Sequence, residues 1–584
     1  MTIKLPKEGV WKQGNLGDKF KDIVASFNLD LTSKFGSLKI SPRFLLNINT
    51  SDAAQLDVAP FAILYVEDDD LWFMGAGADT FRGGNLPNEA FALFAPASGD
   101  PNWETTARPD LAYFNGLLYG VSGELERLDD DSTDWDQIAV TGTPCGAPLI
   151  SFGATGRLYF KAGVDLMASI NTAETLVEAP NTFALDLNDD TQPISCGKAA
   201  SDFIYIGTKA QIGEKARVHK WNGSSTAVTT TYQIEAQAVL AMTIKDNVPW
   251  IFDSNGVLRV LNGGAFVEVD RIPFQEGKPI RPLTGSHTTY MCHYNGMVSD
   301  KDNIYILVNT AYADGTTDER CPAGIWKYNE RTGLHHFGSL GTTKSGGTIT
   351  DYGGARLSAV GALALAKVND SDTNGTLLAG ATIFTSATAT TVGIFYDDSN
   401  DTLQKAGSFV IAKQFSENIT ETWQKFYLRF RKFLNSTDKI VVKARTEEDE
   451  PTEATITYVN TTSFTVLASA FTTNPAVGDE VEILRGVGAG RTAHITAVTG
   501  TTTLTCTVDE TITGATTQTA TGRFQTWKKL GSYNAQTDDF LKLPIDLSLV
   551  GSTPWIQFKV WCLWTGKNEI YDTIISSKVN EAIE

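Results

Sequence analysis

Acidic and amide side chains in one short loop are the main candidates for metal binding in this sequence. Asp370, Asp372 and Asn374 stand at alternate positions before Gly375, which matches the first half of an EF-hand calcium loop. The twelfth position of such a loop carries a bidentate Glu, but here it is Ala381. The flanking residues have strand patterns. We keep a calcium site at these three residues as one hypothesis and a plain polar hairpin loop as the other.

Catalytic chemistry has few candidates. The runs Asp68–Asp70 and Asp129–Asp131 would suit a glycoside hydrolase only if two carboxylates faced one cleft, and triple-Asp runs at turns are usually solvated. His335 and His336 are adjacent, so on a strand they point to opposite faces. The Gly-rich run 485–491 has no Gly-Lys-Ser/Thr ending, which favours a hairpin turn over a phosphate loop. We predict no catalytic residues, no cofactor and no enzyme.

Bulk properties restrict the class of protein further. The six Cys are scattered without a Cys-x-x-Cys pair, so we expect free thiols and neither a zinc site nor a disulfide framework. We expect no membrane span and no signal peptide, since neither a stretch of about 20 apolar residues nor an apolar N-terminal segment occurs. The net charge is −20, which disfavours nucleic-acid binding because phosphate contacts need clustered Lys and Arg.

The charge is unevenly distributed along the chain. Residues 61–140 hold sixteen Asp/Glu against three Arg, whereas residues 1–43 hold eight Lys/Arg against four Asp/Glu. Residues 423–445 hold seven Lys/Arg and one Asp. These runs are either solvated surface loops or, alternatively, an acidic face that avoids polyanions and basic segments that dock on acidic neighbours.

A short phrase recurs six times and is the most informative pattern in the sequence. Each copy has a polar turn, then an aliphatic residue, an aromatic residue and further strand-like positions. The aromatic residues, spaced 40–55 residues apart, are Trp72, Tyr119, Tyr159, Tyr205, Trp250 and Tyr305. Repeats of this length with strand patterning are typical of β-propeller blades. We expect these aromatics to fill the space between blades, with a sugar-binding stripe as the alternative.

We therefore predict an all-β protein with a six- or seven-bladed β-propeller, the segment Asn374–Leu378 being a degenerate seventh copy. At 584 residues the chain exceeds one core, so several units are expected. The predicted units are an N-terminal arm with a closing strand (1–58), the propeller (59–404), a C-terminal β-sandwich (405–450 and 524–584) and a small β-barrel inserted into the sandwich (451–523). The alternating run Gly36–Phe44 is the candidate for the closing strand.

These features together resemble tail proteins of double-stranded DNA bacteriophages. The resemblance rests on the Lys/Arg-rich arm, the degenerate blades, the segment Gly324–Leu334 and the strand Trp423–Phe433. It is strongest with the propeller-bearing nozzle, or tail-tube, protein of short-tailed phages. Over residues 59–400 the resemblance is one of architecture, and over about 405–584 it is one of general sequence character. The resemblance carries over no catalytic residues.

The resemblance implies a structural protein of the virion tail, made in the host cytoplasm and acting by assembly. It implies a homo-oligomeric ring, hexameric in that family, that contacts the adaptor and fibres and surrounds the DNA exit channel. An acidic chain is compatible with this role, because a conduit that bound phosphate would retain the genome. DNA would pass transiently without specific binding.

Two other functions remain open from the sequence. One is a receptor- or carbohydrate-binding propeller adhesin, whose sign would be an exposed aromatic stripe. The other is a propeller glycoside hydrolase, which needs convergent, partly buried carboxylates in the central cleft.

Overall fold

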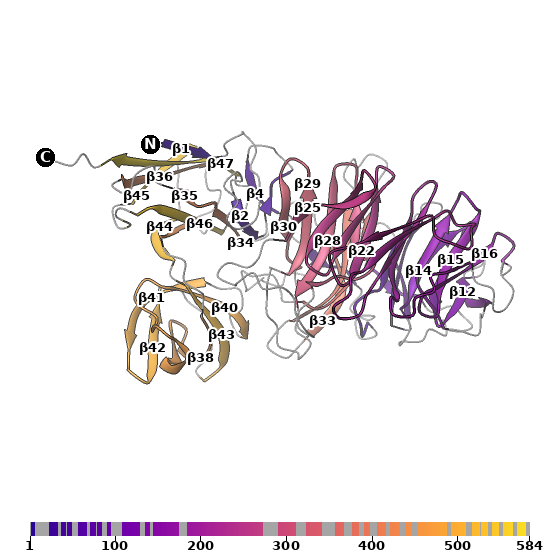
Figure 1. Cartoon of the computed structure of the whole chain (residues 1–584). Coiled ribbons are helices and arrows are strands. Elements are labelled where there is room, and N and C mark those ends of the chain that lie inside the picture. The colour runs from indigo at the N-terminus through magenta and orange to yellow at the C-terminus, as the bar shows by residue number, and fades with distance from the viewer. Residues whose placement is uncertain are drawn as a thin grey trace.

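Antiparallel strands dominate the computed structural model of this chain, which confirms the all-β prediction. Figure 1 shows a propeller beside a sandwich, with a small barrel attached to the sandwich. The structure describes residues 2–5, 23–27, 29–32, 37–41, 44–48, 56–66, 71–77, 79–83, 90–94, 108–128, 135–139, 144–174, 184–272, 290–310, 323–340, 357–366, 376–384, 390–397, 406–415, 421–431, 439–446, 452–486, 492–509, 517–525, 527–534, 540–547, 550, 553–563 and 569–579. Within these ranges no helix has the length and apolar character needed to span a bilayer.

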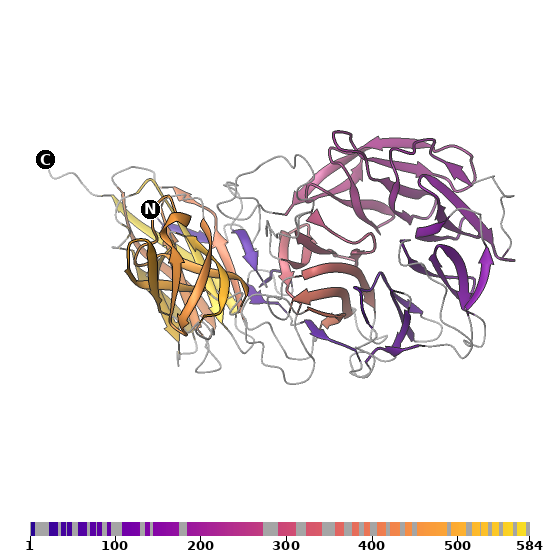
Figure 2. The same cartoon turned by 90° about the horizontal axis from the view of Figure 1, so that it is seen from below.

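Seven sheets follow one another around a ring, so the propeller has seven blades (Figure 2). Blade 1 consists of β6 (Ala62–Val66), β7 (Leu71–Ala76), β8 (Asp79–Gly83) and β9 (Ala92–Leu93). Blade 2 consists of β10 (Asp110–Phe114), β11 (Leu117–Ser122), β12 (Glu124–Leu128) and β13 (Trp135–Ala139). Blade 3 consists of β14 (Cys145–Phe152), β15 (Arg157–Ala162), β16 (Leu166–Asn171) and β17 (Leu185–Asp186). Blade 4 consists of β18 (Ile194–Ala199), β19 (Ile204–Thr208), β20 (Arg217–Trp221) and β21 (Thr230–Gln233). Blade 5 consists of β22 (Val239–Lys245), β23 (Val248–Asp253), β24 (Val257–Asn262) and β25 (Ala265–Arg271). Blade 6 contains β26 (Tyr290–Met291), β27 (Met297–Ser299), β28 (Asn303–Thr310), β29 (Gly324–Asn329) and β30 (Gly333–Gly338).

Blade 7 combines strands from two distant parts of the chain. Its strands β31 (Leu357–Ala366), β32 (Thr376–Phe384) and β33 (Thr390–Asp397) are completed by β5 (Phe44–Leu46), which pairs antiparallel with β33. The degenerate seventh copy thus supplies the second strand of a blade, β32. An N-terminal strand paired with the last three closes the ring, because it ties the beginning of the propeller to its end.

The closing strand lies further along the chain than we predicted. Within the run Gly36–Phe44, Leu38–Ile40 forms β4, which pairs in the sandwich, and only Phe44 belongs to the closing strand β5. The closing strand Phe44–Leu46 has three apolar residues in a row, so the alternation that selected Gly36–Phe44 does not mark it.

The sandwich has two sheets, and the N-terminal arm contributes strands to both. One sheet contains β3 (Leu29–Asp30), β4, β47 (Glu569–Val579), β36 (Glu421–Arg431) and β45 (Phe540–Asp546), with β1 (Thr2–Leu5) paired to β47. The other contains β2 (Ile23–Phe27), β34 (Ala406–Ile411), β46 (Trp555–Leu563), β37 (Lys439–Arg445) and β44 (Lys528–Asn534), with β35 (Gln414–Phe415) paired to β46. Phe426 and Phe558 stack between the two sheets with ring centroids 4.4 Å apart.

The inserted unit is a closed barrel of six strands, as the sequence predicted in outline. In spatial order these are β38 (Thr452–Asn460), β39 (Ser463–Leu467), β42 (Thr503–Val508), β41 (Thr492–Thr499), β40 (Glu480–Gly486) and β43 (Thr519–Gln525). The short 3₁₀ helix η1 (Ala468–Ala470) follows β39. Because β38 and β43 pair with each other, the barrel leaves and rejoins the sandwich at neighbouring points.

Closure of the ring should be testable through Phe44, whose side chain is fully buried. Its ring packs edge-to-face on Phe337 of blade 6 at 6.1 Å, and a side chain at Gly338 would collide with it. We expect Phe44→Ala to destabilise the propeller by about 3–5 kcal/mol, because it leaves a cavity in the closing seam. Denaturant unfolding of the purified chain, followed by hydrogen exchange in blades 6 and 7, measures this.

Phe415→Ala provides the matched control, because Phe415 is 44% exposed in the sandwich. That variant should leave exchange in the propeller unchanged. Equal protection of blades 6 and 7 in the Phe44 variant and the parent chain would contradict closure by β5.

Candidate functional site

The six repeated aromatics all lie on the second strand of a blade, and none is more than 8% exposed. Tyr159 packs edge-to-face on Trp221 of the next blade at 5.1 Å and donates a hydrogen bond to the Gly223 carbonyl. Trp250 packs on Tyr328 of blade 6 at 5.6 Å. These rings are therefore used between blades, where no sugar ring can stack on them.

Adjacent side chains on the second strand of a blade point to opposite faces of the sheet, so each packs against a different neighbouring blade. Leu158 packs in the space between blades 2 and 3, and Tyr159 packs between blades 3 and 4. In blade 1, Trp72 packs against blade 7 and Phe73 against blade 2. The structural counterpart of Tyr159 in blade 1 is therefore Phe73, one residue after the Trp72 that the sequence phrase selected.

The calcium candidates Asp370, Asp372 and Asn374 lie outside the described residues, as do the runs Asp68–Asp70 and Asp129–Asp131. Across the part of the chain that is described, no group of three His, Cys, Asp or Glu is placed to hold a metal ion. The polar groups that the structure does bring together lie at three places: the propeller axis, the propeller–sandwich joint and the barrel–sandwich joint.

At the axis, Asn295 of blade 6 contacts four other blades. Its amide nitrogen donates to the Asp110 carboxylate of blade 2 at 2.6 Å and to the Phe61 carbonyl of blade 1 at 3.2 Å. Its side-chain oxygen accepts from the Lys198 ammonium of blade 4 at 3.4 Å, and its carbonyl accepts from the Leu363 amide of blade 7 at 2.8 Å. One residue can reach blades this far apart only where their inner strands converge.

The carboxylate of Asp110 is fully used by this network. Besides Asn295, it accepts hydrogen bonds from the backbone amides of Leu111 and Leu149, both at 2.9 Å. Burial raises the pKa of Asp110, although the Lys198 charge and these hydrogen bonds oppose the rise. Asp110 therefore acts as a tie between blades 2, 3 and 6.

Two basic side chains, Arg108 and Lys198, lie beside this network. The Arg108 guanidinium lies 4.4 Å from the ring centre of Tyr294 and donates to the Ile194 carbonyl at 3.4 Å. Burial, with a smaller contribution from Arg108, lowers the pKa of Lys161 to about 8. Burial also lowers the pKa of His293 to about 3, with Arg108 and Lys198 adding to the effect. His293 is therefore neutral at pH 7.

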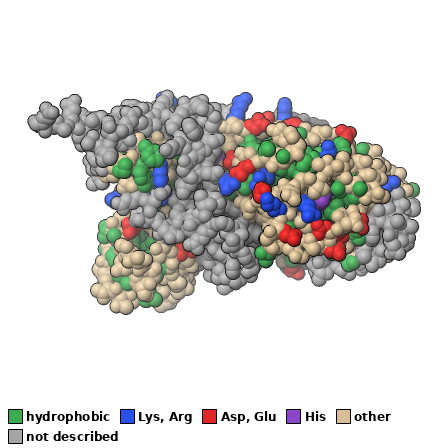
Figure 3. Space-filling model, in the orientation of Figure 1, with side chains coloured by type: hydrophobic (Ala, Val, Ile, Leu, Met, Phe, Trp, Pro, Cys, Tyr) green, Lys and Arg blue, Asp and Glu red, His purple; other side chains and the backbone are tan. Residues whose placement is uncertain are grey.

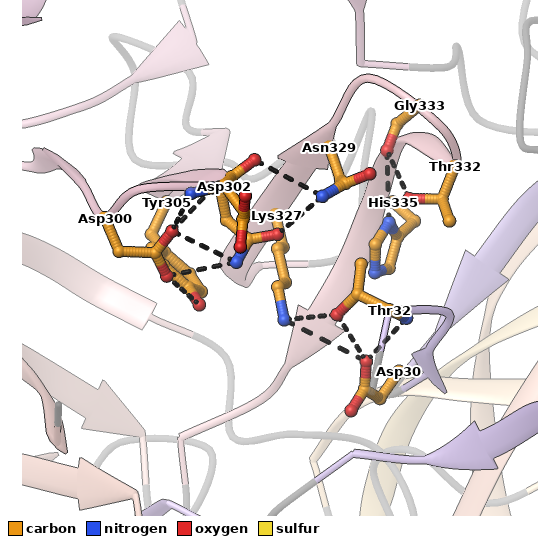
Figure 4. Close-up of polar contacts among 11 residues, drawn as sticks. Asp30, Thr32, Asp300, Asp302, Tyr305, Lys327, Asn329, Thr332, Gly333 and His335 are labelled. Atoms are coloured by element: carbon orange, nitrogen blue, oxygen red, sulfur yellow. Dashed lines mark hydrogen bonds and ion pairs between the residues drawn. The ribbon is translucent and has the colours of Figure 1, made fainter. Parts of the chain in front are cut away.

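The second place is the joint between blade 6 and the sandwich, where Lys327 of β29 is buried (Figure 4). Its ammonium donates to the Thr32 hydroxyl and lies 3.9 Å from the Asp30 carboxylate. It also lies 4.6 Å from the ring centre of Phe337 and 5.4 Å from that of Tyr305. The charge thus has a carboxylate and two aromatic faces in place of water.

The adjacent histidines reinforce the blade and this joint. His336 donates its backbone amide to the Ser26 hydroxyl of the sandwich strand β2 at 3.1 Å, and its ring nitrogen donates to the Ala323 carbonyl at 3.0 Å. His335 donates from Nδ1 to the Gly333 carbonyl at 3.2 Å. Burial lowers the pKa of both rings to about 4, so both are neutral at pH 7.

The third place joins the barrel to the sandwich through the fully buried Glu480 of β40. Its carboxylate accepts hydrogen bonds from Lys443 and, at 2.9 Å, from Lys559, both in the sandwich. Burial raises the pKa of Glu480, but Lys443 and Lys559 outweigh it and hold the pKa well below the ordinary value. The buried apolar clusters of sandwich and barrel are separate, so charged contacts dominate this joint.

A second set of charges lies beside Glu480. Asp509 of the barrel accepts a hydrogen bond from Lys529 of the sandwich, and its carboxylate lies 3.4 Å from Nδ1 of His494. The Nε2 atom of His494 lies 3.8 Å from Glu480. The two carboxylates thus connect the barrel to three lysines of the sandwich.

Sequence reasoning missed Asn295, Lys327 and Glu480. Each stands in an ordinary strand or turn context, and the partner that makes it important lies far away in the chain. Lys327 is part of Gly324–Leu334, a segment that carries the family resemblance but gives no sign that its lysine is buried. No local signal marks a polar residue whose partner is supplied by another unit.

On the outer face, charges of both signs are interspersed over the propeller (Figure 3). Arg217 pairs with Asp189 at 2.6 Å and Arg271 with Glu268 at 2.8 Å. Exposed pairs of this kind contribute little to stability.

Asn295→Ala should destabilise the propeller by about 1–3 kcal/mol, because it removes hydrogen bonds to the buried Asp110 and to Phe61. Tryptophan fluorescence during urea unfolding measures the change. Asn262→Ala, at an exposed position at the end of β24, is the matched control and should leave the midpoint unchanged. Equal unfolding midpoints for both variants would show that Asn295 does not stabilise the contacts between blades at the axis.

Glu480→Gln should weaken the barrel–sandwich joint by about 3–5 kcal/mol, because it leaves the buried Lys443 without its carboxylate. The folded pKa lies below the ordinary value of 4.5, so the carboxylate stabilises the joint above about pH 4.5 and stops doing so as the pH falls. Hydrogen exchange at β37, β40 and β46, measured at pH 7 and at successively lower pH from 4.5 downward, tests both effects.

Glu482→Gln is the control for this joint, since Glu482 is 31% exposed and pairs with Arg523 at 3.5 Å. Its effect should stay below about 1 kcal/mol. A Glu480 variant with unchanged exchange at neutral pH would show that the joint does not depend on this ion pair.

No protein-family model and no curated protein matches this sequence. Among solved structures, the crystal structure of the computationally designed Ika8 protein aligns with 12% identity and a TM-score of 0.34, over 61% of this chain and 99% of that one. KlHsv2 with loop 6CD replaced by a Gly-Ser linker aligns with 8% identity and a TM-score of 0.31, over 62% and 95%. At these scores the overlays are loose, and the seven-bladed propeller is defined by the strand pairing itself.

Proposed function

We propose that this chain is a structural component of a bacteriophage tail, a nozzle or hub ring through which DNA is ejected, and that it acts by assembly and not by catalysis. It would form a homo-oligomeric ring, six-fold by the family resemblance, in contact with adaptor and fibre proteins. The site of action would be the virion tail, after synthesis in the host cytoplasm.

The observation that carries this proposal is the way the three units are fastened to one another. Lys327 and Ser26 tie the propeller to the sandwich, and Glu480 ties the barrel to the sandwich, all through buried groups. Buried charges hold geometry strictly, because breaking such a contact leaves an uncompensated ion. A component that keeps neighbours in register in a tail needs such a fixed arrangement.

The blade aromatics give secondary support. They are buried between blades, so they cannot serve as the exposed stripe that a carbohydrate-binding propeller would use. The carboxylate at the axis, Asp110, is committed to three hydrogen-bond donors. Both observations favour a supporting role for the propeller over the adhesin and the hydrolase.

Two measurements on the full chain test the proposal. Sedimentation analysis together with negative-stain images should show a closed ring of several copies, and antibodies against the chain should label one end of the tail on particles made from the genome that encodes it. Unlabelled particles that lack the chain would refute the tail assignment. If the particles are labelled but the purified chain stays monomeric at every concentration, the proposal of a self-assembled ring is wrong.

A further inference from the structure

One buried histidine at the joint between blade 6 and the sandwich has a ring nitrogen without a partner. His335 has no exposed surface. Its Nδ1 donates to the Gly333 carbonyl at 3.2 Å, so in the neutral ring Nε2 carries no proton. Among the described residues, Nε2 of His335 has no hydrogen-bond partner. Buried polar atoms are nearly always paired, so this nitrogen needs an explanation.

His335 lies directly beside the buried Lys327. The two residues are opposite each other in the antiparallel register of β29 and β30, and opposite residues place their side chains on the same face of a sheet. The Lys327 ammonium donates to the hydroxyl of Thr32, which follows the sandwich strand β3. Figure 4 shows the His335 ring pointing toward the same Thr32. The imidazole therefore lies at the contact between the two units.

The carboxylates near His335 already have partners. The Asp30 oxygen Oδ1 accepts hydrogen bonds from the amide and the hydroxyl of Thr32, at 2.9 and 2.8 Å, and lies 3.9 Å from the Lys327 ammonium. The titratable groups on the elements that adjoin His335 are Lys327 of β29, Asp30 of β3, Asp270 of β25, which accepts from the Leu334 amide at 2.8 Å, and His336 of β30 itself.

A proton on His335 would therefore add a second cation beside Lys327, with Asp30 already engaged by the first. Burial lowers the pKa of His335 to about 4; Lys327 adds to the effect, while Asp30 opposes it. Water can solvate a charged ring only if the ring becomes exposed. The segment at Thr32, toward which the ring points, belongs to the other unit, so exposure follows from separation of the two units at this joint.

We propose that the joint between blade 6 and the sandwich is a pH-sensitive hinge, which opens when His335 takes up a proton. In the open joint the hydrated ring has the ordinary pKa of 6.5, whereas in the closed joint the pKa is about 4. The closed joint therefore has its full stability above about pH 7 and loses stability as the pH falls from 6.5 toward 4.

The adjacent His336 supplies the means to observe this opening. Its ring packs edge-to-face on Trp326 at 5.5 Å and bonds to the Ala323 carbonyl at 3.0 Å, both within blade 6, so the ring stays covered when the sandwich moves away. Its backbone amide, in contrast, donates to the Ser26 hydroxyl of the sandwich at 3.1 Å. That amide loses its partner when the joint opens.

Hydrogen exchange at the His336 amide of the full chain, measured from pH 7.5 to pH 5.5 and corrected for the intrinsic pH dependence of exchange, tests the hinge. Asp and Glu side chains with ordinary pKa values stay ionised over this range. The equilibrium constant for opening should rise about tenfold from pH 7.5 to pH 5.5, because opening is coupled to the uptake of one proton by His335. In His335→Gln, which cannot titrate, this rise should disappear.

His219→Gln is the matched control, since His219 of blade 4 is also buried and its pKa is also lowered to about 4. Its Nδ1 pairs with the Thr231 hydroxyl of the same blade at 2.9 Å. This variant should retain the tenfold rise at the His336 amide. Circular dichroism and the unfolding midpoint at pH 7.5 establish that the variants are folded, and His335→Asn takes the place of the glutamine variant if that one does not fold.

Two results would overturn the hinge. One is an opening constant of the parent chain that does not change between pH 7.5 and pH 5.5, which needs no variant. The other is a tenfold rise that persists without His335, since the proton would then be taken up by another group. Neither result depends on whether the chain forms a ring or belongs to a tail.

Discussion

Every blade of this propeller has apolar side chains on both faces, so each blade depends on a neighbour on either side. Adjacent residues on a second strand divide this work, as Leu158 and Tyr159 do by packing against blades 2 and 4. A linear row of seven blades would leave two apolar faces exposed to water. Ring closure removes both faces, and here it depends on β5, a strand that precedes the whole propeller in the chain.

Closure also determines what the axis contains. Seven inner strands converge there, and the segment around Asn295 joins blades 1, 2, 4 and 7 through hydrogen bonds from a single residue. These bonds give the buried Asp110 carboxylate its partners. The same geometry that closes the ring therefore buries a hydrogen-bonded carboxylate at its centre.

The joints between units follow a different principle from the packing inside them. Within the propeller and the sandwich, apolar side chains supply most of the buried contact. Between units, Lys327 with Asp30 and Glu480 with Lys443 lie at the contact and the apolar clusters stay separate. Separating a buried pair leaves an uncompensated charge, so such joints resist separation of the units, which suits a protein whose proposed work is assembly.

Strand alternation and a 40–55-residue repeat are enough to predict the all-β class, the propeller and the inserted barrel, because both are local patterns along the chain. The alternation pattern misplaced the closing strand, since Phe44–Leu46 is apolar throughout and only its pairing with β33 identifies it. It also selected Trp72 where Phe73 is equivalent, because a one-residue shift exchanges the two faces of a strand. Which polar residues connect the blades and units depends on tertiary contacts. Asn295 and Glu480 gain their roles from partners on other blades and other units, and the energy of a buried polar group depends on what surrounds it, which no local pattern records.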